Sequence, residues 1–551
     1  MSSIWRKATM LAVCLAALPA QAQDRPQPDR SDPAVIQREL ERQEPQPQTR
    51  QGHIEFRAPQ QGGAMAQSEE LVASAIRIKG AERLPHAAFS SAIEPYLGRP
   101  LEQAELVRLA TDVAGAARER GYGLATAWVP AQDLVGGILT VEIDEGRIDA
   151  VRATGPGARL VEQRMGEVIG QGPVRTQELE RQLLIIGDMA GLWVGEARLL
   201  REGGRNVLAL STRYQRTHGL VRLDNWGTSA VGPVRAWAEV NFNGLGVRGD
   251  SLTIGAALTP LQPEEFQFIE ARYRVPLGAG GTMFGVGGYI GHTSTDDGRS
   301  AGGYEGESKQ VDVELAHPLA RARDASLWLT GRLELRDSSL DQGSLRVRDD
   351  RIASASASFY GFGRAAGGRI RARVSLIQGL DAFGATGRDD PLASRLDAGG
   401  VFTKLESWGE YLRSLGSGFS LELAVRSQIS DGPLLASEEM GLGGPQFLRA
   451  FDYRELSGDE GAAGSAELRF DLKEVAPQID RIQFYTFVDG GRVSNHGARA
   501  YAGDIASAGG GARLRLRNGW EANAELGVPL TDGGRDWDPK PRFSFAITAR
   551  F

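Results

Sequence analysis

The chain has 551 residues, a formal net charge of −7, 71 glycines and a single cysteine, Cys14. This length accommodates two to four domains, and the acidic charge balance argues against a nucleic-acid partner. A single cysteine excludes internal disulfides and metal sites built from several thiolates.

Residues 1–22 have the features of a secretory signal peptide. Arg6 and Lys7 precede an apolar run, and Ala20-Gln21-Ala22 forms an Ala-x-Ala cleavage site. We expect the mature chain to begin after this site, with a net charge of −9 because two cations are removed. A lipoprotein anchored through Cys14 is disfavoured, because the apolar run continues past this residue.

Residues 31–43 predict a short helix. Asp32 is a suitable N-cap, and Ile36 and Leu40 lie on one face. Residues 44–70 are rich in Pro, Gln and Gly and have no periodicity, which indicates a linker. On composition alone the helix is a terminal segment without an assigned role.

Residues 71–146 and 147–214 repeat one β-α-α-β-β pattern. Strands are predicted at 75–79, 124–129, 138–145, 147–153, 194–200 and 206–214, and helices at 86–96, 103–120, 159–169 and 176–190. The longest helix has an apolar stripe formed by Leu106, Leu109, Ala110, Val113 and Ala117. Each unit of roughly 70 residues can just hold its own core. The edges of its sheet can accept an extended guest strand, which is typical of an interaction module.

Residues 215–551 alternate between polar and apolar side chains with a period of two. Arginines at 369, 371 and 373 alternate with apolar residues, and similar patterns recur at 513–517 and 542–551. No apolar run of 18 residues follows the signal peptide, so no transmembrane helix is predicted. Repeated arginines opposite apolar residues favour a closed β-barrel with a wet lumen and a lipid-facing exterior. The segments number sixteen, as in barrels with an aqueous channel.

The links between the predicted strands alternate between long and short, as in membrane barrels. If the first strand rises from the periplasm, the long links at 292–308, 338–350, 379–396 and 428–463 are extracellular. The short links at 276–280, 364–368 and 518 are then periplasmic. In this arrangement the link at 428–463 is the sixth extracellular one, and it joins strands eleven and twelve.

The sixth link contains an arginine among aromatic residues. Its stretch Gly443–Gly461 includes Arg449 close to Phe451. Loops of this length are usually functional or disordered, and a buried arginine needs an anionic partner. The candidate partner is Asp489, in the predicted strand segment Phe487–Gly491.

These motifs resemble those of the outer-membrane transporters of two-partner secretion (the TpsB family), in a superfamily that also contains the barrel-assembly insertases. Leu448-Arg449-Ala450-Phe451 is similar to the family's Val-Arg-Gly-Tyr/Phe loop motif, and Phe487, Asp489 and Gly491 match its Phe-x-Asp-x-Gly strand motif. If the glycine position of the loop motif requires a positive φ, Ala450 is strained there. Further matches are Glu455–Asp459, Asp224–Gly227, Asn243–Gly246, Gly121-Tyr122, Val129–Gln132 and the terminal Phe551.

The resemblance implies a 16-stranded antiparallel transmembrane barrel at 215–551, preceded by two POTRA domains at 71–146 and 147–214. It also implies that the 31–43 helix, with Ile36 and Leu40, plugs the pore. The protein is then expected in the outer membrane of a Gram-negative bacterium, with its POTRA domains in the periplasm.

The resemblance further implies a role for the loop and strand motifs. Arg449 and Asp489, with Phe451, Phe487 and Gly491 around them, are expected to latch the sixth link inside the lumen and to gate it. The expected partners are outer-membrane lipid and a secreted exoprotein (an adhesin, haemolysin or toxin), which the POTRA domains bind unfolded. We expect the transporter to act as a monomer.

Three other functions compete with secretion. A barrel-assembly insertase shares the loop and strand motifs, but the two POTRA-like units and the plug-like helix favour a transporter. A passive porin explains sixteen strands but not the periplasmic repeats. An enzyme is disfavoured because the six histidines are scattered and form no His-Glu-x-x-His motif, so no catalytic residue, cofactor or metal is expected.

Overall fold

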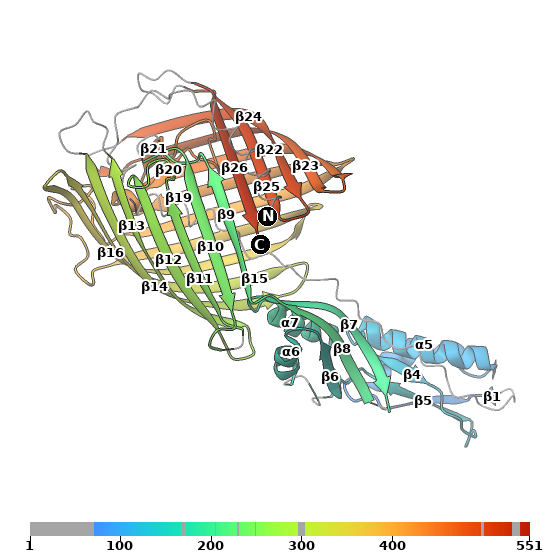
Figure 1. The fold of residues 1–551 in the computed structure, drawn as a ribbon. Helices are drawn as coiled ribbons and strands as arrows, with labels where there is room; N and C mark the ends of the chain where they lie inside the picture. The colour runs from blue at the N-terminus through green and yellow to red at the C-terminus, as the bar shows by residue number, and fades with distance from the viewer. Residues whose placement is uncertain are drawn as a thin grey trace, which may run out of the picture.

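The computed structural model shows a closed barrel with two α/β units extending from one of its rims (Figure 1). No helix among the described residues is long and apolar enough to cross a membrane. The predicted signal peptide and linker, and the 31–43 helix apart from Pro33, lie outside the described residues. The structure describes residues 33, 71–166, 169, 172–203, 205–228, 231–247, 249–295, 303–497, 501–531 and 540–551.

The first α/β unit is a three-stranded sheet covered by helices. Its elements are β1 (Leu71–Val72), β2 (Ala75–Lys79), η2 (His86–Phe89), α4 (Ser90–Ile93), η3 (Glu94–Tyr96), β3 (Pro100–Leu101), α5 (Gln103–Glu119), β4 (Thr126–Trp128) and β5 (Ile138–Asp144). The sheet order is β2-β5-β4, with β2 parallel to β5. Glu102 and Glu105 form a capping box at the start of α5, and Leu109, Val113 and Ala117 of its apolar stripe are fully buried. The helix predicted at 86–96 is instead three short pieces.

The second unit has the same order of elements. They are β6 (Ala150–Thr154), α6 (Ala158–Met165), α7 (Thr176–Gly187), β7 (Leu192–Glu202) and β8 (Arg205–Tyr214), in a sheet of order β6-β8-β7. Leu124 of the first unit is buried in the core of the second. The backbone N–H of Thr176 donates to the carbonyl of Gly121 at 2.9 Å. The two units are therefore joined by packing as well as by the chain.

Sixteen antiparallel strands form the barrel, which confirms the predicted fold class. They are β9 (Thr217–Asp224), β10 (Arg235–Asn243), β11 (Ser251–Leu258), β12 (Phe266–Leu277), β13 (Thr282–Thr295), β14 (Tyr304–Arg321), β15 (Ser326–Gln342), β16 (Leu345–Ala365), β17 (Gly368–Leu380), β18 (Thr403–Gly416), β19 (Phe419–Ser430), β22 (Glu460–Ala476), β23 (Ile479–Ser494), β24 (Ala502–Leu516), β25 (Trp520–Pro529) and β26 (Arg542–Arg550). Each strand pairs with the next, and β26 pairs with β9 to close the circle.

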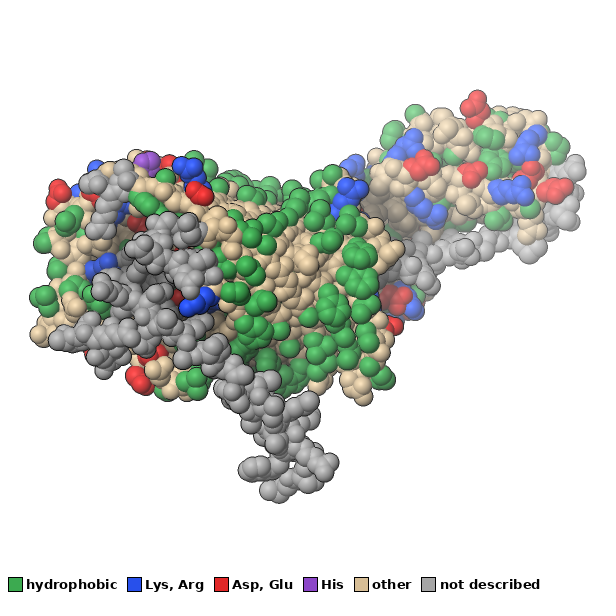
Figure 2. Space-filling model, turned by 90° about the horizontal axis from the view of Figure 1, so that it is seen from above, with side chains coloured by type: hydrophobic (Ala, Val, Ile, Leu, Met, Phe, Trp, Pro, Cys, Tyr) green, Lys and Arg blue, Asp and Glu red, His purple; other side chains and the backbone are tan. Residues whose placement is uncertain are grey.

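The two faces of the wall differ as the alternation predicts. Ile370, Val374 and Leu376 on β17 point outward and are 41%, 43% and 51% exposed. Figure 2 shows hydrophobic side chains gathered on the outside of the wall. Inside, Arg272 donates to both carboxylate oxygens of the buried Asp312, at 2.7 and 2.9 Å. Buried ion pairs of this kind line the lumen, and the apolar exterior suits lipid.

The long link predicted at residues 338–350 is not present, and this prediction was wrong. Strands β15 and β16 continue through most of 338–350 and are separated by only residues 343 and 344. Here both faces of the hairpin are polar, so the alternation that marks a strand inside lipid is lost. Cross-strand ion pairs hold the hairpin instead, Arg346 with Asp341 and Arg351 with Asp337. The predicted link at 292–308 is likewise shorter, because β13 reaches Thr295 and β14 begins at Tyr304.

The second α/β unit docks on the periplasmic turns of the barrel. Arg321, at the end of β14, donates two hydrogen bonds of 2.7 Å to the carboxylate of Asp188, which follows α7. Arg164 of α6 donates to the carbonyl of Gly278 in the turn between β12 and β13, at 2.6 Å. A Cβ placed on Gly281 would come within 3.2 Å of Ile185 of α7. These contacts fix the direction in which the α/β units leave the barrel.

Replacing Arg321 with alanine is expected to loosen this joint without unfolding the barrel. The Arg321 side chain is 1% exposed and that of Asp188 is 38% exposed, so breaking this half-buried pair should cost more than the ~1 kcal/mol of an exposed pair and less than the ~3–5 kcal/mol of a fully buried one. Distances between spin labels on the first α/β unit and the barrel, measured by electron paramagnetic resonance, should broaden. Arg364→Ala is the matched control, because its pair with Asp324 on the neighbouring turns is exposed on both sides. Unchanged distances in Arg321→Ala would contradict this role.

Candidate functional site

The sixth extracellular link, residues 431–459, joins β19 to β22 and folds into the lumen. It contains the short helix η4 (Ala436–Glu438) and a hairpin of β20 (Met440–Leu442) and β21 (Leu456–Gly458). Its side chains Leu448 and Phe451 are fully buried, in a cluster with Val493 of β23 and Ile505 of β24. Apolar packing against the wall therefore holds the link in one conformation.

Arg449, at the tip of the link, is buried against β23. Its Nε and Nη2 atoms each donate to the carboxylate of Asp489 at 3.0 Å. The guanidinium also stacks on the ring of Phe487, 3.5 Å from the ring centroid. Asp489 in addition accepts from the backbone N–H groups of Leu448 and Arg449 at 3.1 and 3.2 Å. The structure thus brings together the arginine and the aspartate that the two motifs paired.

Two further carboxylates surround Arg449. Its Nη1 atom donates to Glu467 of β22 at 2.7 Å and to Glu525 of β25 at 3.3 Å. Glu467 also accepts two hydrogen bonds from Arg513, so the cluster carries compensating charges. Neither glutamate was singled out from the sequence, because alternation along a strand does not report the register between strands, and this register brings both carboxylates to the arginine.

Small residues of the wall make room for the tip of the link. A Cβ on Gly491 would lie 3.0 Å from the side chains of both Leu442 and Leu448. The left-handed conformation suspected at Ala450 occurs instead at Leu448, where φ is 63°. Ala450 is absent from the non-glycine residues with positive φ, so it carries no strain of that kind.

Replacing Gly527 with valine is expected to displace the tip and reduce secretion. A Cβ at this position on β25 would meet the backbone N and Cα atoms of Ala450 at 3.0 Å, an overpacking that costs about 1–3 kcal/mol. Gly490→Val is the matched control, because its Cβ would meet nothing within 4 Å. Ala450→Gly should behave like the wild type. Secreted protein in the medium measures the effect, and normal secretion by Gly527→Val would contradict it.

The base of the link is held at a different place on the wall. Glu438 of η4 forms ion pairs of 2.9 Å with both Arg336 of β15 and Lys404 of β18, and all three side chains are 1% exposed. In the closed order of sixteen, β15 is the seventh strand and β25 the fifteenth. The base also contacts strand ten (β18, through Lys404), and the tip also contacts strands twelve and thirteen (β22 and β23). The sixth link is therefore held at two separate sectors of the lumenal wall.

The predicted plug residues Ile36 and Leu40 lie outside the described residues. Pro33, the described residue of that segment, is helical and buried. A Cβ on Gly291 of β13 would be 3.3 Å from the Cβ of Pro33. Gly291 is buried next to the outward-facing Ile290, so Pro33 lies on the lumenal side of the wall.

Comparisons with known proteins agree with this architecture. Residues 203–514 match a family described as haemolysin secretion/activation protein ShlB/FhaC/HecB, and residues 71–146 match a ShlB-type POTRA domain. The outer membrane transporter CdiB of Dickeya dadantii is 24% identical over 425 residues, which cover 73% of this chain and 72% of that protein. The heme/hemopexin transporter protein HuxB of Haemophilus influenzae is 22% identical over 392 residues, which cover 69% of this chain and 68% of HuxB.

Solved structures share the fold. CdiB from Escherichia coli superposes with a TM-score of 0.73 at 20% sequence identity, covering 96% of this chain and all of CdiB. BamA from Haemophilus ducreyi lacking POTRA domains 1–3 gives a TM-score of 0.50 at 13% identity, covering 88% of this chain and all of that one.

Proposed function

The chain belongs to the ShlB/FhaC/HecB family of haemolysin secretion/activation proteins, and from this premise we propose how it secretes its partner exoprotein across the outer membrane. Its two POTRA domains capture the exoprotein unfolded in the periplasm, and the barrel conducts it to the cell surface. The partner is a secreted adhesin, haemolysin or toxin, and one transporter chain serves as the pore. Folding of the exoprotein outside the cell prevents its return.

Capture is assigned to the open edges of the POTRA sheets. Among the described strands, β2 and β4 of the first sheet and β6 and β7 of the second each pair on one side only. An unpaired edge offers N–H and C=O groups to an extended guest strand. Because such pairing uses the backbone, it suits a partner that arrives unfolded and is recognised before it has tertiary structure.

Gating is assigned to the sixth link. We use the term latch for Arg449 with Asp489, Glu467 and Glu525. The observation that carries the proposal is the position of this link inside the lumen, where its base and its tip are bound to two separate sectors of the wall through buried charges. An exoprotein chain cannot share the lumen with the link in this position. Release of the latch is therefore a step of secretion.

A capture experiment with the full-length transporter in detergent tests the proposal. The probe is the N-terminal secretion region of a candidate exoprotein, diluted from urea immediately before mixing. We expect the transporter to retain the unfolded probe but not the same region after refolding. A variant lacking residues 71–146 should lose retention, while its barrel still shows heat-modifiable migration. Equal retention of the folded and unfolded probes would contradict capture by strand addition.

The same preparation separates secretion from membrane-protein insertion. An insertase would accelerate the folding of an unrelated outer-membrane barrel into vesicles that contain it. We expect no acceleration by this chain, because its POTRA pair is assigned to an exported partner. Acceleration comparable to that by a barrel-assembly insertase would favour the competing function.

A further inference from the structure

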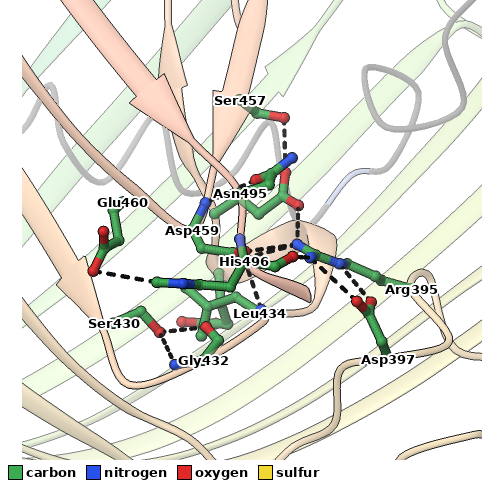
Figure 3. Close-up of polar contacts among 12 residues, drawn as sticks. Arg395, Asp397, Ser430, Gly432, Leu434, Ser457, Asp459, Glu460, Asn495 and His496 are labelled. Atoms are coloured by element: carbon green, nitrogen blue, oxygen red, sulfur yellow. Dashed lines mark hydrogen bonds and ion pairs between the residues drawn. The ribbon is translucent and has the colours of Figure 1, made fainter. Parts of the chain in front are cut away.

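Asp459, at the end of the sixth link, joins three extracellular links. Its carboxylate is fully buried and accepts two hydrogen bonds from Nη1 of Arg395, at 2.9 and 2.8 Å (Figure 3). It also accepts from the backbone N–H of Leu434 at 2.8 Å and of His496 at 2.7 Å. Arg395 belongs to the fifth link (381–402), Leu434 to the sixth, and His496 to the seventh (495–501). One carboxylate thus contacts all three links.

Arg395 strengthens the same junction from the fifth link. Its side chain is 3% exposed, and its Nε atom donates to Asp397 at 2.7 Å. Its Nη2 atom donates to the backbone carbonyl of His496 in the seventh link. Burial acts to lower the pKa of Arg395, but the hydrogen bond from Arg395 to Asp397 and the attraction of Asp459 raise it above its ordinary value. The guanidinium therefore stays charged at the centre of the junction.

The fifth link is also packed against the base of the sixth by apolar contacts. Ala398 and Phe402 of the fifth link share a buried cluster with Leu434 and Leu435 of the sixth. This cluster uses none of the residues of the Arg449 latch. Links that only projected into the medium would bury neither a charge pair nor this apolar surface.

We propose that the fifth, sixth and seventh links form a cap across the extracellular mouth of the barrel, and that Asp459 is the positioning residue that holds the cap together. Release of Arg449 frees the tip of the sixth link, whereas its base stays tied to both neighbours through Asp459. The exoprotein therefore leaves the barrel only after the fifth link parts from both the sixth and the seventh, at the contacts of Arg395 with Asp459 and with the carbonyl of His496. This inference rests on the proposed secretion function and adds a second gate at its exit.

A reversible disulfide across the cap is the direct test. A Cβ on Gly497 of the seventh link would lie 3.4 Å from Cγ of Asp397 in the fifth. Cysteines at both positions can therefore meet, with a local adjustment of the seventh link, because a cysteine at 497 must adopt a φ of 72° and its Cβ lies 3.1 Å from Cγ of Pro433. The double variant Asp397→Cys with Gly497→Cys carries the only two cysteines after the predicted signal peptide, since Cys14 lies within it. We expect secretion to fall at least tenfold under oxidation and to recover with reductant, whereas each single variant stays insensitive.

A variant that removes the charge of Asp459 provides an independent test, which requires no exoprotein. Asp459→Asn keeps the shape of the side chain but weakens its hold on Arg395. We expect its open probability in planar bilayers to rise at least threefold over the wild type. Glu460→Gln is the matched control, because this neighbouring carboxylate is 34% exposed and lies 3.2 Å from Nε2 of His496.

Two results would overturn the cap. One is unchanged secretion by the oxidised double variant, with disulfide formation verified by electrophoresis. The other is equal conductance of Asp459→Asn and Glu460→Gln. If the reduced double variant fails to secrete, the conductance comparison decides. Because conductance is measured without exoprotein, failure of the cap is distinguishable from failure of POTRA capture.

Discussion

Replacing Arg449 with methionine is expected to reduce secretion strongly while the barrel still assembles in the outer membrane, because a link that is never latched cannot be released in step with the arriving exoprotein. The substitution leaves Asp489 and Glu525 buried without their shared guanidinium, whereas Glu467 keeps Arg513. Removing one partner of a buried charge cluster costs about 3–5 kcal/mol. This is enough to displace the tip of the sixth link, but the backbone pairing of the sixteen strands is untouched.

The three carboxylates predict a graded series rather than equal effects. Asp489→Asn should reduce secretion less than Arg449→Met, because Glu467 and Glu525 still bind the arginine. Arg449→Asp should be the most severe, since it adds a fourth carboxylate to the cluster. Asp489→Arg should also be severe, because Glu467 already binds Arg513 and Arg469, which leaves Glu525 to accept two guanidinium groups.

Secreted exoprotein in the medium and heat-modifiable migration of the barrel measure this series. Arg346→Met is the matched control, because Arg346 is 43% exposed on the β15–β16 hairpin and pairs with Asp341 there. Normal secretion by both Arg449→Asp and Asp489→Arg would show that the cluster is not a latch.

Replacing Glu438 with glutamine is expected to detach the base of the sixth link. Arg336 and Lys404 would then lose the carboxylate they share, although Arg336 keeps Glu334 and Lys404 keeps Glu406. The remaining partners lower the expected cost to the bottom of the range for buried pairs, about 3 kcal/mol. Amide hydrogen exchange should accelerate in β20 and β21, while exchange in the barrel strands stays unchanged.

Asp431→Asn is the control for Glu438. This carboxylate stands at the start of the same link, where it accepts from the backbone N–H of Thr403 at 2.9 Å in an exposed position. Its exchange pattern should match the wild type. Because the base and the tip share no charged partner, Glu438→Gln and Arg449→Met should have additive effects on stability. Unaltered amide hydrogen exchange of β20 and β21 in Glu438→Gln would show that the base of the sixth link has no part in gating.

The barrel and the Arg449–Asp489 contact could be predicted because both are encoded in short, local stretches of the sequence. Alternation with a period of two reports which side of a strand meets lipid, and each member of the ion pair lies in a short motif. The long link predicted at 338–350 was wrong for the same reason. Above the membrane both faces of a strand meet water, so polar residues there indicate a loop even where β15 and β16 continue.

The contacts that the sequence did not predict depend on the register between strands and on places where three segments of the chain come together. Glu467 and Glu525 reach Arg449 only because β22, β23 and β25 are staggered as they are. Glu438 meets Arg336 and Lys404 from segments far apart in the chain, and no spacing rule connects them. Asp459 falls in a stretch that resembled the family pattern, but its role required coordinates for the fifth and seventh links.

The hairpin of β15 and β16 provides a site at which all of these variants can be labelled on the cell surface. Its strands end in a two-residue turn at 343 and 344, where the neighbouring side chains are exposed, and exposed turns of this kind tolerate insertions. A short epitope placed there would be stained by antibody on intact cells. Fluorescence per cell would then count the copies that reached the surface, so that a secretion defect could be divided by the number of transporters present.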